Sequence, residues 1–193
     1  MKSDIDDMHY YLVESVKQLK PKDIVNFQNT EEWVSYFLPK TTKVFGRAFL
    51  KEIFDSENDR LLVLMGHLYL ENILVEIIKH KFKNIDKLEK SGITNSFYKK
   101  VKLLESQNYL SEDIVTDIIF INEIRNKFVH NLKYTLDEID IFRFFHMTRF
   151  RDYLEIKNKK ARMAFNKLLI KLTFMYLLFK LSKKHRFIHL MNV

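Results

Sequence analysis

The chain has 193 residues, of which 33 are Lys or Arg and 25 are Asp or Glu, so its formal net charge is +8. With only 3 Gly and 2 Pro it lacks the turn residues of an all-β fold. It contains no Cys, which excludes disulfides, thiolate metal sites and cysteine nucleophiles. Gly46, Gly66 and Gly92 stand apart, so no Gly-rich phosphate-binding loop is present. These features predict a basic, all-α protein.

The first part of the chain, residues 1–54, is predicted to be an N-terminal helical extension. Apolar side chains recur there at helical spacing until Pro21, and two shorter helices are expected near residues 30–38 and 42–54. The acidic start of the chain lacks the apolar run of a signal peptide, so we expect a cytoplasmic protein. Residues 55–193 are predicted to form the main helical bundle.

The bundle is predicted to begin with a long helix capped by Asn58 and reaching about Phe82. The polar stretch 84–94 is predicted to be a loop, and a helix is expected from Phe97 to about residue 107. Ser111 is predicted to cap the next helix, whose first turn carries two acidic residues that favour a helix start.

The helix that follows Ser111 carries the most informative pattern in the chain. Its inward face repeats at spacings of four and three residues, through Ile114, Ile118, Ile121, Arg125 and Phe128. A cation on an apolar stripe is costly unless it is paired or lines a site. The stripe therefore marks Arg125 as a candidate functional residue.

Two further helices are predicted beyond this one. Thr135 to Glu138 has the pattern of a capping box, which predicts a helix from Thr135 to about residue 156. The last helix is expected at about residues 161–183. Its apolar stretch, Leu168 to Leu181, is too short to span a membrane, which needs about 20 apolar residues. We interpret it as a core helix and expect no membrane partner, with attachment to a membrane surface as the alternative.

The positive charge is concentrated near the C-terminus. Residues 143–189 contain 13 Lys or Arg and 2 Asp or Glu, whereas the rest of the chain has a balance of −3. Phenylalanines and a tyrosine are interleaved with these cations. The pattern fits a nucleic-acid-binding surface, but helix spacing explains most of the aromatics, which favours a helix pair with a solvated basic face and a Phe-rich core.

One motif carries a specific chemistry, namely Arg125 followed five residues later by His130. A histidine titrates near neutral pH and can take the proton of an RNA 2′-hydroxyl, while an arginine fork stabilises the phosphate oxygens. Asn126 shares a helix face with His130 and can orient it or contact the phosphate. The predicted reaction needs no metal or cofactor and leaves a 2′,3′-cyclic phosphate and a 5′-hydroxyl, so DNA is not cut.

A structural interpretation of the same residues stays open. Arg125 can pair with a buried acid such as Glu71, and His130 can stabilise the helix C-terminus. His67 and Glu71 are four residues apart and resemble half of a metal site, but no further ligand pair has useful spacing, so no metal site is predicted.

Residues 125–130, Arg-Asn-Lys-Phe-Val-His, resemble the signature of HEPN domains. HEPN domains are helical bundles, often dimeric, and many are metal-independent ribonucleases of toxin and antiviral systems. The chain is similar over about residues 58–181 to the mannitol-repressor-like (MltR-like) branch. That similarity includes the long first helix, the Ser-Phe start at 96–97, and Ala161 to Phe165 opening an apolar last helix.

The resemblance implies a HEPN-like bundle acting as an endoribonuclease in a toxin–antitoxin or antiviral defence setting. His130 would be the base, Arg125 the phosphate clamp and Asn126 the positioning group, with Glu71 orienting Arg125. RNA, a second copy of the chain and an antitoxin or regulatory protein are the implied partners. The alternative functions are a non-catalytic regulator acting through protein contacts, and plain RNA binding by the basic C-terminal region.

Overall fold

The fold was obtained as a computed structural model, which describes residues 56–144 and 159–185. These residues form five α-helices, two short 3-10 helices and no strand, so the all-α prediction is confirmed for them. The α-helices are α5 (Asp59–Lys81), α6 (Ile85–Lys90), α7 (Phe97–Ser106), α8 (Glu112–His130) and α9 (Lys159–His185), and the 3-10 helices are η1 (Leu136–Glu138) and η2 (Ile141–Arg143). The extension predicted for residues 1–54 lies outside the described residues.

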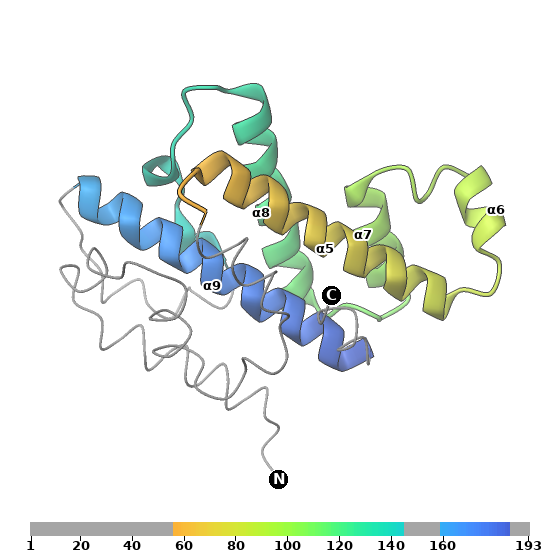
Figure 1. Cartoon of the computed structure of the whole chain (residues 1–193). Coiled ribbons are helices and arrows are strands. Elements are labelled where there is room, and N and C mark those ends of the chain that lie inside the picture. Colours follow the sequence, from red (N-terminus) through yellow and green to blue (C-terminus); the bar gives the residue numbers. More distant parts are fainter. Residues whose placement is uncertain (1–55, 145–158, 186–193) are drawn as a thin grey trace, which may run out of the picture.

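Helices α5 and α9 lie side by side, α8 crosses against α5, and the three form the body of the molecule (Figure 1). Helices α5 and α8 are antiparallel, since Arg60 near the start of α5 bonds the carbonyl of Asn131 just after α8. Helix α9 runs parallel to α5, because Lys167 near its start pairs with Asp59. Helix α7 packs beside α5 and α8, and α6 extends from the far end of α5 (Figure 1).

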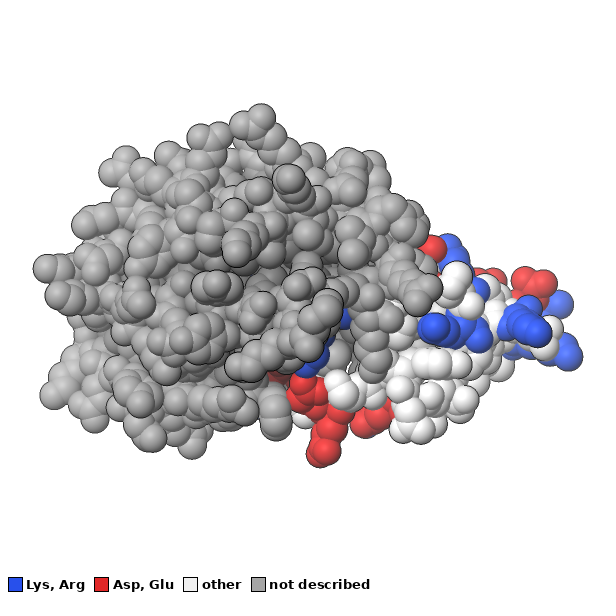
Figure 2. Space-filling model, turned by 90° about the horizontal axis from the view of Figure 1, so that it is seen from below, with Lys and Arg blue, Asp and Glu red and all other residues white. Residues whose placement is uncertain are grey.

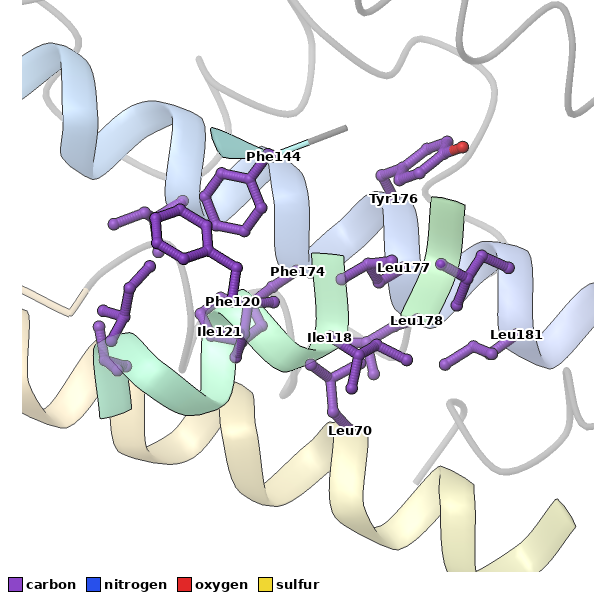
Figure 3. Packing of buried hydrophobic residues seen from close by; sticks show 14 of the residues in the cluster. Leu70, Ile118, Phe120, Ile121, Phe144, Phe174, Tyr176, Leu177, Leu178 and Leu181 are labelled. Atoms are coloured by element: carbon purple, nitrogen blue, oxygen red, sulfur yellow. The ribbon is translucent and has the colours of Figure 1, made fainter. Parts of the chain in front are cut away.

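A single apolar core joins α5, α7, α8 and α9. Leu70 of α5, Ile118 and Ile121 of α8, and Phe174 and Leu178 of α9 are at most 2% exposed, and they meet between the three long helices (Figure 3). The apolar segment Leu168–Leu181 is therefore a core helix, as predicted.

The predicted starts of α5, α7 and α8 agree with the structure, and side-chain capping bonds fix the first two. Asn58 Oδ1 accepts hydrogen bonds from the amides of Arg60 and Leu61, both at 3.0 Å. Ser96 Oγ accepts from the amide of Lys99 at 3.3 Å and starts α7. Ser111 is the N-cap of α8, although its side chain makes no capping bond to the helix amides.

The loop predicted for residues 84–94 is wrong over 85–90, where α6 forms. The carbonyl of Asn84 accepts from the amides of Lys87 and Leu88, which starts a helical turn. Leu88 packs against the core, so even this Lys-rich segment has one apolar anchor. Gly92, at φ +70°, then reverses the chain in a conformation that favours glycine.

The α-helix predicted from Thr135 is also wrong over the described residues. The capping box is present, but the chain forms only the 3-10 turn η1 before the backbone becomes extended at Ile139. The side-chain amide of Asn166 donates to the carbonyls of Leu136 and Ile139, at 2.7 and 3.1 Å. In an α-helix those carbonyls would accept hydrogen bonds from backbone amides. Here the side-chain amide of Asn166 on α9 bonds them instead. The remainder of the predicted helix, 145–156, lies outside the described residues.

Among the described helices, α5 is long and apolar enough to cross a membrane by length and composition, with a mean hydropathy of 1.7. Half of that apolar window is buried against the rest of the molecule. A core helix of a soluble protein passes the same test, so the feature is weak evidence for a membrane span.

Candidate functional site

The inward face of α8 has the composition that its spacing predicts. Ile114, Ile118, Ile121 and Phe128 are buried, at no more than 2% exposed, and they belong to the core. Arg125, the fifth member, is only half-buried, because it lies at the border between the core and the surface. Its Nη1 donates a hydrogen bond to Asn126 Oδ1 at 3.0 Å. The structure thus brings Arg125 and Asn126 together.

His130 is the last residue of α8, and it is exposed. The helix remains regular up to this point, since the amide of Asn131 still donates to the carbonyl of Lys127 at 2.9 Å. Residues five apart on a regular helix lie about 140° apart around its axis. His130 therefore shares a face with Asn126 and not with Arg125, and within the described part of the chain no hydrogen bond joins it to Arg125, Asn126 or Glu71.

Cationic and aromatic side chains surround this end of α8. The guanidinium of Arg60 donates to the carbonyl of Asn131 at 3.2 Å and lies 5.7 Å from the centroid of the Phe128 ring. Lys127 Nζ lies 5.5 Å from the centroid of the Tyr134 ring. These contacts place two cations on aromatic faces at the end of α8 that carries His130.

The predicted contact between Glu71 and Arg125 is wrong in this structure. Glu71 Oε1 instead accepts from Lys100 Nζ of α7 at 2.7 Å, and the ammonium-bearing side chain of Lys100 is 10% exposed. Lys100 lies on the inward face of α7 with Phe97, Val101 and Leu104, so it reaches across to the nearest carboxylate on α5. Glu71 thereby ties α7 to α5.

A buried histidine next to this ion pair was not assigned a role by the sequence. His67 is 6% exposed and its Nε2 lies 3.0 Å from Asn122 Oδ1. An amide oxygen can only accept, so Nε2 carries the proton. The ring also lies 4.1 Å from the Phe97 ring. Each residue is visible in the sequence, because His67 precedes Glu71 by one turn and Asn122 precedes Arg125 by nearly one turn. Their pairing is not visible, because it joins two helices.

Burial lowers the pKa of His67 below its ordinary value, and the charges of Arg125 and Lys100 lower it as well. The hydrogen bond with Asn122 and the charge of Glu71 act in the opposite direction but are outweighed. His67 is therefore neutral near pH 7, and its bond to Asn122 links α5 to α8.

No group of three or more metal-ligating side chains occurs among the residues of 56–144 and 159–185. The pair of His67 and Glu71 is explained by its other contacts, since the imidazole bonds Asn122 and the carboxylate bonds Lys100.

Comparison with protein-family models, with curated proteins and with solved structures found no match to this chain.

Proposed function

We propose that this protein is a metal-independent endoribonuclease of the HEPN type. The observation that supports it best is the end of α8, which remains helical through an exposed His130. One turn earlier on the same face stands Asn126, and Asn126 is hydrogen-bonded to Arg125. A base, an amide and a guanidinium thus stand within two turns of one helix, beside further cations.

The proposed reaction is attack of an RNA 2′-hydroxyl on the adjacent phosphate. His130 takes the hydroxyl proton, and Arg125 stabilises the negative charge that develops on the phosphate oxygens. Asn126 orients the Arg125 fork through their 3.0 Å hydrogen bond. Glu71 acts indirectly, because its bond to Lys100 fixes α7 against the helix that carries His67. The products are a 2′,3′-cyclic phosphate and a 5′-hydroxyl.

The proposal includes a homodimer, because one copy cannot bring Arg125 and His130 together on a regular helix. Around His130 the surface is apolar as well as basic, with Val129 39% exposed and Leu132 86% exposed. Leu61, 50% exposed, follows Arg60 and therefore belongs to the same end of the molecule. A second copy that covers these side chains would bring two motifs face to face. The setting we propose is toxin or phage defence, with an antitoxin or regulatory protein as the controlling partner.

The test is incubation of the purified full chain with mixed RNA in EDTA, beside His130→Ala and Arg125→Ala variants. The wild type is expected to release fragments with cyclic-phosphate ends, and both variants are expected to lose activity by at least about 100-fold. Full activity in His130→Ala would contradict the assignment of the base. Complete resistance of a DNA copy of the same sequence is the matched substrate control.

A non-catalytic regulator that works through protein contacts is the second candidate. It is favoured by the exposed Leu61, Leu68 and Leu132, which form apolar surface without any catalytic requirement. In that case Arg125 and Asn126 would serve only the stability of α8. Arg125→Ala would then lower the melting temperature while no RNA is cut, whereas a true site residue can be removed without a loss of stability.

A further inference from the structure

The end of the molecule that carries α6 is strongly basic. Residues 79–102 cover the last turn of α5, all of α6 and the first part of α7, and they contain 8 Lys against 2 Asp or Glu. Seven of these lysines are exposed, and only Lys100 is buried. Figure 2 shows blue basic side chains gathered at this projecting end, with acidic side chains among them.

Most of the exposed lysines at this end have no acidic partner among the residues that the structure describes. Lys79 and Lys102 form ion pairs with Glu76 and Glu105 inside their own helices. Across residues 56–144 and 159–185, no carboxylate lies within ion-pair distance of the other five, which are Lys81, Lys83, Lys87, Lys90 and Lys99. Their charges are therefore available to an external anion.

The cations near the C-terminus differ in this respect. In the described part of 143–189, Arg143 pairs with Glu123, Lys167 with Asp59, and Lys180 with Asp113. Lys159 and Arg162 share Asp137, and Lys171 is 4% exposed. These six cations are thus matched by carboxylates or buried, although the sequence alone gives the region the larger charge excess.

We propose that the α6 end, meaning the exposed lysines of residues 79–102 together with Tyr98, binds the backbone of single-stranded RNA. The choice of RNA rests on the proposed function, while the binding surface itself lies apart from Arg125 and His130. Tyr98 is 51% exposed and Lys102 Nζ lies 5.7 Å from its ring centroid, an arrangement that suits stacking of an unpaired base.

The chemistry of this end favours RNA over an anionic membrane. Tyr98 is the only large apolar side chain of residues 79–102 that is highly exposed. The aliphatic side chains of Ile85, Leu88 and Ile93 are only partly exposed, so the surface offers little to insert among acyl chains. Each lysine that neutralises a phosphate of a single strand releases about 0.7 of a counterion, which gives binding a steep salt dependence.

The two RNA-contacting regions lie at opposite ends of α5. The 23 residues of α5 rise about 34 Å, and its first turn contacts the end of α8 whereas its last turn leads into α6. An RNA strand held at the α6 end and cut near His130 would therefore run along the long axis of α5 (Figure 1). The α6 end would position the substrate without contacting the reacting atoms.

The test measures binding of a fluorescein-labelled oligouridylate by anisotropy across a salt series, in a His130→Ala background so that the RNA stays intact. The variant Lys87→Gln/Lys90→Gln is compared with Lys159→Gln/Arg162→Gln, which removes the same charge from cations that pair with Asp137. We expect the α6 variant to bind roughly tenfold more weakly and its log K against log salt slope to fall by about 1.4. The control variant should match the His130→Ala parent.

Equal losses in both variants, or none in the α6 variant, would overturn the proposal. The same variants are also tested for binding to vesicles containing phosphatidylserine. If the α6 variant loses binding to these vesicles but not to RNA, the surface belongs to a membrane and the proposal is wrong. Because binding is read without cleavage, lysine-dependent binding in this assay, together with no RNA cleavage by the wild type, would contradict the ribonuclease and leave this inference standing.

Discussion

His67 lies between the Phe97 ring and Asn122, at 6% exposed, so its environment disfavours the charged imidazolium. Its pKa in the folded chain is lower than in the unfolded chain, where it is about 6.5. Below that value the unfolded state binds more protons than the folded state. The contribution of His67 to stability is therefore complete above about pH 6.5 and is lost as the pH falls below it.

This linkage predicts that the wild type loses more of its unfolding free energy between pH 7.5 and pH 5 than the variant His67→Gln, which cannot be protonated. Urea unfolding at both pH values measures the difference. Asp113, whose carboxylate is held by Lys180 and has a lowered pKa, titrates at lower pH and acts alike in both proteins. Identical pH dependence of the two proteins would show that His67 is accommodated in its charged form.

At the residue scale, the sequence shows Arg125 as an interruption in a regular apolar stripe, where the structure has it half-buried. It could not assign the partner of Glu71. The cation that pairs with it is Lys100, which comes from another helix, and the distance between two helices depends on how they pack. For the same reason the bond of His67 to Asn122 could not be predicted from either helix separately.

At the element scale, Gly66 determines how closely α5 approaches α9. A Cβ atom at this position would overlap the ring of Phe174, which is 1% exposed. Alanine is a better helix former than glycine by about 1 kcal/mol, but forcing extra volume into a packed core costs about 1–3 kcal/mol. The two effects oppose each other, and the steric cost is expected to be larger.

We predict that Gly66→Ala lowers the unfolding free energy by about 1–2 kcal/mol. Phe174→Ala alone should cost about 3–5 kcal/mol, and adding Gly66→Ala to it should cost nothing further because the ring is gone. Urea denaturation of the four proteins of this cycle provides the measurement. A stabilised Gly66→Ala protein would mean that helix propensity governs this contact.

Helix starts were predictable because capping is local, and Asn58 caps α5 with two amide bonds. Helix continuation was less predictable. The capping box at Thr135 formed as the sequence indicates, yet Asn166, far along the chain, bonds the carbonyls that would have continued the helix. Helix α6 was missed for the opposite reason, since one leucine contact with the core is enough to order a short polar helix.

At the scale of the whole molecule, the proposed site depends on a second copy of the chain. The wild type is expected to sediment with twice its mass of 23.4 kDa. A charge at Leu132, which is 86% exposed beside His130, should separate the copies, because a dimer would have to bury it. We therefore predict that Leu132→Lys sediments as a monomer and loses RNA cleavage together with dimerisation.

The matched control is Thr116→Lys, since Thr116 is exposed near the other end of α8. It should remain dimeric and active. Analytical ultracentrifugation of the three proteins decides the matter, and a monomeric wild type that still cuts RNA would show that a single chain carries a complete site. Association of copies depends on which surfaces of two folded chains fit together, and the residue spacing of this chain does not give those surfaces.

The ion pairs of α9 affect the position of that helix along its own axis. Its apolar side chains are buried over most of its length, so sliding by one turn would still bury leucine against leucine. Its cations, however, reach carboxylates on three different elements, through Lys167 to Asp59, Lys180 to Asp113, and Lys159 to Asp137. A slip of one turn, about 5.4 Å, would break all three pairs at once. These pairs thus act together with the fit of Phe174 against Gly66 and the two bonds of Asn166 in setting the register of α9.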